Sequence, residues 1–168
     1  MNFKIRAIGE DDCEINSLKL FLFNQIKKVY GIGRNPIFHY DIDDLKKYYI
    51  LPPRNNCFAV YCRGEIVASI AIRAYDKDYD FFRDVYSAND TASIWRLMVD
   101  ENYRRHGLAS MLVGVVEDFA GKAGYGKIYL NTHRYLDGAL QFWQSLGYVI
   151  TVEEDDYDQT THMIKNLF

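Results

Sequence analysis

The sequence predicts a mixed α/β domain of the α+β class, with a central mixed, mostly antiparallel sheet of about seven strands flanked by about four helices. Three observations predict it. Short alternating apolar runs recur as in strands, other stretches carry apolar residues at helical spacing, and two strand–helix–strand units towards the C-terminus imply parallel pairing. No repeat, low-complexity segment or linker interrupts the 168 residues, so we expect a single domain over 1–168.

The first ninety residues are predicted to contain a strand, two helices and a hairpin. The strand covers residues 3–8, and the acidic residues of GEDD cap the helix that follows. A short helix around 41–50 precedes a hairpin with strands at 57–61 and 66–72. Residues 75–90 are polar and aromatic without a period, which indicates a surface loop. The apolar stripe of the first helix is Ile15, Leu18, Leu22, Ile26 and Val29.

The remaining residues are predicted to form four strands and two helices. A strand at 92–99 leads to a helix from Leu108, and a strand at 128–132 follows. Asp137 is the expected cap of the last helix, whose stripe includes Phe142 and Trp143. A final hairpin closes the chain. The stripe of the helix from Leu108 comprises Met111, Leu112, Val115, Val116 and Phe119.

Composition excludes several classes of protein. A formal net charge of −3 disfavours a protein that binds nucleic acid by neutralising phosphates. No apolar run is long enough to cross a membrane, and no signal-peptide layout is present, so we expect a cytoplasmic protein without a membrane partner. The four histidines lack ligand spacing, which predicts no metal site. Three cysteines, Cys13, Cys57 and Cys62, are expected to be reduced core residues.

One stretch concentrates positive charge before a glycine at the start of a predicted helix. The first N–H groups of a helix point outward and favour a bound anion such as phosphate. Small side chains keep the approach to the backbone open, and arginines add charge-assisted hydrogen bonds. The segment alone is equally consistent with a solvated turn, and it lacks the spacing of a nucleotide P-loop. Its members are Arg104, Arg105, His106, Gly107, Leu108, Ala109 and Ser110.

This stretch resembles the acyl-CoA signature of the GNAT acyltransferase superfamily, in which a strand ending in hydrophobic-x-Val is followed by [Q/R]-x-x-G-x-[G/A] at a helix start. Leu97-Met98-Val99 matches the first part, and Arg104 to Ala109 matches the second. The later segment ALQFWQSLGY is similar to a second family motif. The resemblance is specific over residues 94–149 and topological over the first ninety. It implies a GNAT-like fold and acetyl-CoA as the co-substrate.

The resemblance also implies roles for individual residues. The backbone N–H groups from Arg105 to Ser110 would hold the CoA pyrophosphate, with Arg104 beside them. The main chain of Leu97 to Val99 would pair with the pantetheine arm like an added strand, beyond a bulge that the sequence does not reveal. Asn131 would orient a water or the pantetheine amide, and Trp143 would line the thiol end.

The usual acid–base residues of the family are missing. Ser93 stands where a Glu base often lies, and Trp143 stands where the Tyr acid does, although an indole N–H is no useful acid. His133 and Tyr135 are therefore the candidate catalytic residues, since both follow a strand near the expected thioester and His titrates near neutral pH. Trp143 is also consistent with a core aromatic residue, and His133 is also consistent with a polar histidine in a loop.

The sequence thus predicts an acetyl-CoA-dependent N-acetyltransferase acting on a primary amine of a small molecule or peptide by direct attack in a ternary complex. A non-catalytic acyl-CoA-binding or sensing module is the alternative, favoured by the missing acid–base residues. A structural or partner-binding protein that keeps the fold but binds no ligand does not explain the basic stretch RRHGLA at a helix start. Five carboxylates within 153–158 form either a solvated hairpin tip or an attractor for a small cationic acceptor. The oligomeric state, including a homodimer, stays open.

Overall fold

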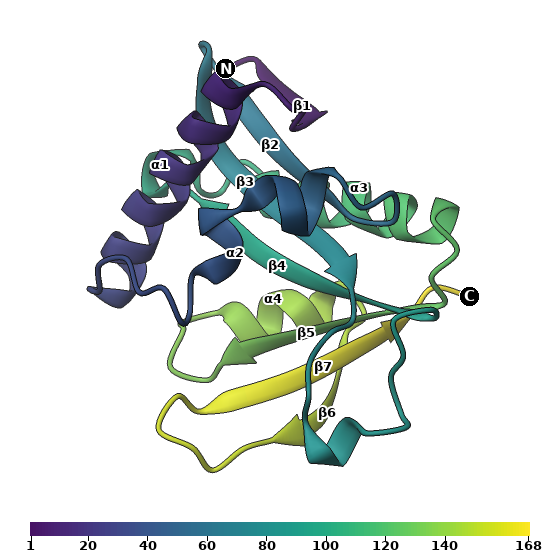
Figure 1. Cartoon of the computed structure of the whole chain (residues 1–168). Coiled ribbons are helices and arrows are strands. Elements are labelled where there is room, and N and C mark those ends of the chain that lie inside the picture. The colour runs from purple at the N-terminus through teal and green to yellow at the C-terminus, as the bar shows by residue number, and fades with distance from the viewer. The chain divides into compact units, whose positions relative to one another are not determined.

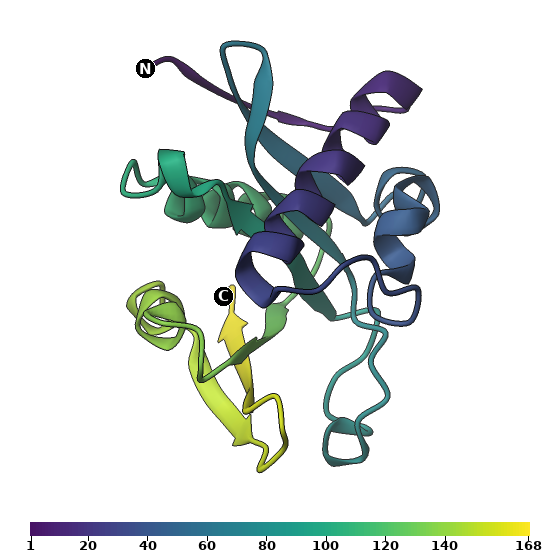
Figure 2. The same ribbon diagram turned by 90° about the vertical axis from the view of Figure 1, so that its left-hand side faces the viewer.

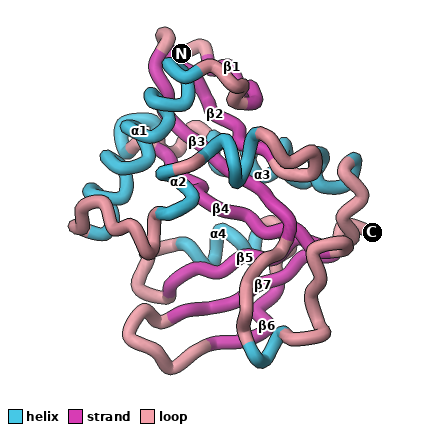
Figure 3. The backbone as a smooth tube through the Cα atoms, in the orientation of Figure 1, coloured by secondary structure: helices cyan, strands magenta, loops and turns pink.

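Seven strands form one mixed sheet in the order β1-β2-β3-β4-β5-β7-β6 in the computed structural model, which describes residues 1–168 (Figure 1). This confirms the predicted fold class and the predicted order of strands and helices (Figure 3). Two compact units divide the chain, residues 1–73 with 95–116 and residues 74–94 with 117–168, and each is described by itself. The strands are β1 (Phe3–Ala7), β2 (Asn56–Cys62), β3 (Glu65–Ala74), β4 (Thr91–Val99), β5 (Lys127–His133), β6 (Val149–Glu153) and β7 (Thr160–Asn166). The α-helices are α1 (Asp12–Tyr30), α2 (Tyr40–Asp43), α3 (Leu108–Lys122) and α4 (Ala139–Ser145).

In the first unit, α1 lies across one face of the β1–β3 strands, and the beginning of α3 lies on the other (Figure 2). Asp11 begins α1, because its carboxylate accepts the Glu14 N–H at 2.8 Å, and Gly31 ends the helix with a left-handed φ of 68°. The predicted stripe is buried except for Val29, which is 37% exposed. In place of the single short helix predicted at 41–50, α2 is followed by a π-helical turn over Lys46–Ile50.

The second unit contains the start of β4, then β5, β7 and β6. Thr91 to Ser93 pair with β5 in parallel, whereas β5–β7 and β7–β6 are antiparallel. The prediction that Asp137 caps α4 is wrong, since Gly138 precedes the helix in a left-handed conformation and no side chain caps it. On the face opposite α4, the loop before β4 covers β5 and β7 (Figure 2).

That loop is more than the surface segment predicted for residues 75–90. It contains a 3-10 turn, Asp80–Phe82, and buries Tyr75 and Phe82 against Tyr129 of β5. These aromatic residues follow neither a helical nor a strand period, and they form part of a core that periodicity alone does not predict. Cys13 is exposed, so the expectation of a core position holds only for Cys57 and Cys62. No helix is both long and apolar enough to cross a membrane.

Candidate functional site

The turn between β4 and α3 presents a row of free backbone N–H groups. Arg105 and Gly107 have left-handed φ angles of 63° and 73°, and the first helical hydrogen bond runs from Met111 N to Gly107 O at 3.0 Å. The six amides from Arg105 to Ser110 donate no hydrogen bond within the chain. Amides at a helix N-terminus that lack carbonyl partners form a site for an anion.

Some side chains of this turn pack against the protein, and others are exposed to solvent. Leu108 is buried and fixes the helix start, whereas Arg104 and Arg105 are exposed. The His106 ring packs on Phe3, and its Nδ1 lies 2.9 Å from Arg104 O. Since a carbonyl oxygen only accepts hydrogen bonds, His106 Nδ1 carries a hydrogen and donates it within the turn. This nitrogen therefore stabilises the turn and is not available to a ligand.

Gly107 keeps the approach to these amides open. A Cβ built on it would meet no atom within 4 Å, so the space in front of the backbone is empty of protein. Its φ of 73° is also one that β-branched residues avoid. Ala109 is small and half-buried, and Ser110 is exposed in the first turn of the helix. The residues present therefore fit a pyrophosphate.

Strand β4 changes conformation at Arg96, whose φ is 53° although it lies inside a strand. A left-handed residue within a strand is a feature of bulges, which bend a strand and end its regular pairing. The register of β4 with β5 covers only Thr91 to Ser93, so Leu97, Met98 and Val99 lie beyond it and are half-buried. The bulge implied by the family resemblance thus has a counterpart at Arg96.

A buried carboxylate fixes this bend. Asp41 of α2 is fully buried, and it accepts hydrogen bonds from Arg96 Nε at 3.0 Å and from Tyr49 Oη at 2.6 Å. Burial by itself would raise the pKa of Asp41, but the Arg96 hydrogen bonds and charge bring it below its ordinary value. The Arg96 carbonyl is also held, since Ser69 Oγ of β3 donates to it at 3.1 Å.

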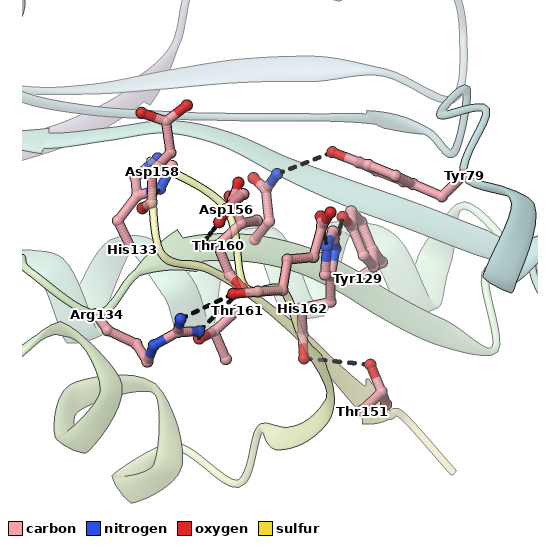
Figure 4. Close-up of polar contacts among 12 residues, drawn as sticks. Tyr79, Tyr129, His133, Arg134, Thr151, Asp156, Asp158, Thr160, Thr161 and His162 are labelled. Carbon is pink, nitrogen blue, oxygen red and sulfur yellow. Dashed lines mark hydrogen bonds and ion pairs between the residues drawn. The ribbon is translucent and has the colours of Figure 1, made fainter.

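The candidate catalytic residues His133 and Tyr135 lie together at the end of β5, in the second unit. Their rings stack with centroids 5.2 Å apart. His133 Nδ1 donates to Asp158 O at 2.8 Å (Figure 4). The lone pair of neutral His133 is therefore on Nε2. Tyr135 is 47% exposed, and partial burial raises the pKa of its phenol.

Asn131 and Trp143 occupy different surroundings within this unit. Asn131 Nδ2 donates to Tyr79 Oη at 3.4 Å. Trp143 is only 7% exposed and packs edge-to-face with Phe142 and Tyr148, at 5.0 and 5.1 Å between ring centroids. These contacts match the core role that the sequence left open for Trp143.

A hydrogen-bonded chain in the second unit was not found from the sequence. His162 is fully buried in β7, with Nδ1 2.7 Å from Tyr129 Oη and Nε2 2.6 Å from Glu154 Oε1 (Figure 4). Burial lowers the pKa of His162, and Glu154 partly offsets this. The only sequence signal is a histidine in the middle of the strand TTHMI. Tyr129 lies 25 residues before Glu154, and Glu154 lies 8 residues before His162, so no local pattern joins the three.

Family membership follows from the comparison of the whole sequence. The sequence model of the acetyltransferase (GNAT) family matches residues 22–148, which include the bend of β4, the amide row and α4. The chain belongs to the GNAT acetyltransferase family.

Two groups of relatives of this GNAT protein are named N-acetylaspartate synthetase and N-acetyltransferase 8. Human N-acetylaspartate synthetase is 28% identical over 119 residues, covering 71% of this chain and 36% of the relative. Human N-acetyltransferase 8 is 32% identical over 108 residues, covering 64% of this chain and 44% of the relative. The chain thus spans only about a third to a half of the lengths of these proteins.

Solved structures share the fold of this GNAT protein across nearly its whole length. A GNAT acetyltransferase from Staphylococcus aureus Mu50 has a TM-score of 0.76 at 18% identity, covering 98% of this chain and all of the other. PaiA N-acetyltransferase from Thermoplasma acidophilum, in complex with coenzyme A, has a TM-score of 0.69 at 17% identity, covering 99% of each chain. At such identities the likeness establishes the fold alone.

Proposed function

We propose that this protein is an acetyl-CoA-dependent N-acetyltransferase that transfers an acetyl group to a primary amine of a small molecule or peptide. The observation that carries the proposal is the row of amides from Arg105 to Ser110, opened by Gly107 at a helix start. Membership of the GNAT family and a relative named N-acetyltransferase 8 support it. The single domain over 1–168 and a cytoplasmic location stay predictions.

Different residues of the chain would bind the two parts of CoA and transfer protons. The amide row, with Arg104 and Arg105, would bind the pyrophosphate, and the backbone of Leu97 to Val99 would bind the pantetheine arm beyond the bend at Arg96. His133 and Tyr135 are proposed to exchange protons with the substrates. Burial raises the pKa of Cys57 to about 12, so this thiol stays protonated, which supports direct attack by the amine over a Cys57 acyl-enzyme.

A non-catalytic acyl-CoA-binding module is the second candidate, and one observation favours it. Ser93 and Trp143 occupy the positions of the usual Glu and Tyr, Ser93 is 1% exposed, and Trp143 packs as a core aromatic. Both candidates require CoA to bind, which calorimetry measures directly. Mass spectrometry of acetyl-CoA mixed with a panel of amines then separates them: acetylated product supports the enzyme, and tight CoA binding without product supports the module.

The acidic turn offers a test of acceptor charge. Two of its carboxylates make hydrogen bonds within the protein. Glu154 binds His162, and Asp156 accepts hydrogen bonds from Thr160 N and Oγ1 at 2.7 Å each. The remaining three, Glu153, Asp155 and Asp158, are exposed. If they attract a cationic acceptor, replacing them with Gln, Asn and Asn should raise KM for a diamine several-fold at low salt, without changing kcat.

The control for this triple variant is its KM for a neutral amine, which should stay unchanged. Added salt should raise the wild-type KM for the diamine towards the variant value, because salt screens exposed charges. Equal diamine KM values for the two proteins at low salt would contradict electrostatic capture by the turn.

A further inference from the structure

Five polar side chains of the second unit contact one another in a chain, in which every link except that between Tyr79 and Tyr129 is a hydrogen bond. Glu154 contacts His162, His162 contacts Tyr129, and the Tyr129 hydroxyl interacts with that of Tyr79. Asn131 then donates to Tyr79 (Figure 4). The chain begins at Tyr79 and Asn131, which are half-buried, and ends at a carboxylate whose side chain is 29% exposed.

The chemistry of these groups gives the chain one direction. A carboxylate only accepts hydrogen bonds, so Nε2 of His162 donates to Glu154 and carries the hydrogen of the neutral ring. Nδ1 therefore holds the lone pair and accepts from the Tyr129 hydroxyl. The Tyr129 oxygen is then left to accept from Tyr79. The Tyr129 proton points towards Nδ1 of His162, and the Nε2 proton points away from the ring towards Glu154. A proton that enters at Tyr79 can therefore be taken up at Nδ1.

The sheet register places this chain beside the residue that replaces the usual base of the family. Ser93 of β4 is the register partner of Tyr129, and Asn131 is the register partner of His162. Register partners share a face of the sheet, so Ser93, Tyr129 and His162 lie on one face. Ser93 Oγ is buried without a hydrogen-bond partner, and a hydroxyl cannot take up a proton as a base at neutral pH.

We propose that Tyr79, Tyr129 and His162 form a proton relay that takes the proton of the acceptor amine. The inference rests on the proposed function. As the amine nitrogen attacks, its N–H bond breaks and Tyr79 receives the proton while passing its own to Tyr129, which passes its own to Nδ1 of His162. The electron pair stays on nitrogen, and the imidazolium lies against Glu154, which returns the proton to solvent. His133 and Tyr135 are then left to protonate the departing thiolate.

The surroundings of His162 suit an acceptor that is neutral before the reaction. The ring lies among Tyr79, Phe81 and Phe82 of the loop, with centroids 4.7 to 5.2 Å away. Burial and the charge of Lys77 lower the pKa of His162, whereas Glu154 and Asp156 raise it, and the pKa lies below its ordinary value. The ring is therefore neutral at pH 7. Burial raises the pKa of Tyr129, which stays a protonated conduit.

The variants that test the relay are Y129F, E154Q and H162N. H162N keeps an oxygen that can accept from Tyr129 but removes the titrating ring. Y75F is the matched control, because the Tyr75 ring lies 5.1 Å from that of Tyr129 and its buried hydroxyl makes no hydrogen bond. The measurements are CoA affinity, the pH profile of kcat with an amine that the wild type acetylates, and NMR of the His162 ring nitrogens.

The relay predicts a wild-type His162 that is neutral at pH 7 with its hydrogen on Nε2. Y129F and H162N should lower kcat by about a hundredfold with CoA affinity unchanged, and Y75F should not. E154Q removes a charge that raises the His162 pKa, so the acid limb of the kcat profile should move to lower pH together with the NMR titration. A purely structural contact would change stability without moving that limb.

The opposite results are distinguishable. A His162 with its hydrogen on Nδ1, or an acid limb that stays in place in E154Q and H162N, would overturn the relay while leaving the acetyltransferase proposal intact. A wild type that binds CoA but acetylates no amine would overturn both the proposed function and the relay.

Discussion

Replacing Gly107 by valine should weaken CoA binding at least tenfold, which corresponds to about 1.4 kcal/mol. Gly107 has a φ of 73°, a conformation that a β-branched residue adopts only with strain. The new side chain would also fill the open approach in front of the amide row. Titration calorimetry with CoA measures the affinity, and thermal unfolding shows how much of the loss is a loss of fold.

The matched control is Gly64→Val in the turn between β2 and β3. Gly64 has a φ of 86°, and a Cβ there also meets nothing within 4 Å, so the backbone strain is similar. G64V should lose stability but keep its CoA affinity. If G107V binds CoA within twofold of the wild type while remaining folded, the amide row is not the pyrophosphate site.

Replacing Asp41 by asparagine should destabilise the protein by about 3–5 kcal/mol, because it leaves the Arg96 guanidinium without its buried counter-charge. Asp41 is fully buried, and the Arg96 side chain is 15% exposed, so solvent cannot replace the lost carboxylate. Asparagine has nearly the same volume, which excludes a cavity as the cause. Urea unfolding of wild type and D41N at pH 7 measures the difference.

The pH dependence of this difference has a definite sign. Burial raises the pKa of Asp41, but Arg96 holds it below its ordinary value in the folded protein. Its contribution is therefore fully present above the unfolded value of about 3.9 and is lost as pH falls through the folded pKa. The wild-type advantage over D41N should shrink below about pH 4.

A surface ion pair provides the comparison for Asp41. Arg34 Nε lies 2.8 Å from Asp43, but the Arg34 side chain is 61% exposed. Since exposed pairs contribute little, R34A should cost less than about 1 kcal/mol. A D41N variant that loses no more stability than R34A would show that the buried pair stabilises the protein no more than an exposed one does.

Local sequence patterns predicted the elements and the amide row. The row and the neighbouring Arg104 occupy one continuous segment, Arg104–Ser110, in which charge, a glycine and a helix start are neighbours in the chain. Its geometry depends on residues close in sequence, so reading the sequence was enough to locate it. The expected bulge in β4 had no such signal, because Arg96 owes its conformation to partners elsewhere, including Asp41, 55 residues earlier.

The proton relay depended entirely on the tertiary structure. Tyr129, Glu154 and His162 meet only when β5, β7 and β6 pair in one register, and a shift of one residue would turn each side chain to the other face. The loop that brings Tyr79 over them has no period from which to predict its packing. Sequence alone therefore determined the order of elements, the family and the turn proposed to bind an anion, whereas strand register decided which buried polar groups are hydrogen-bonded to one another.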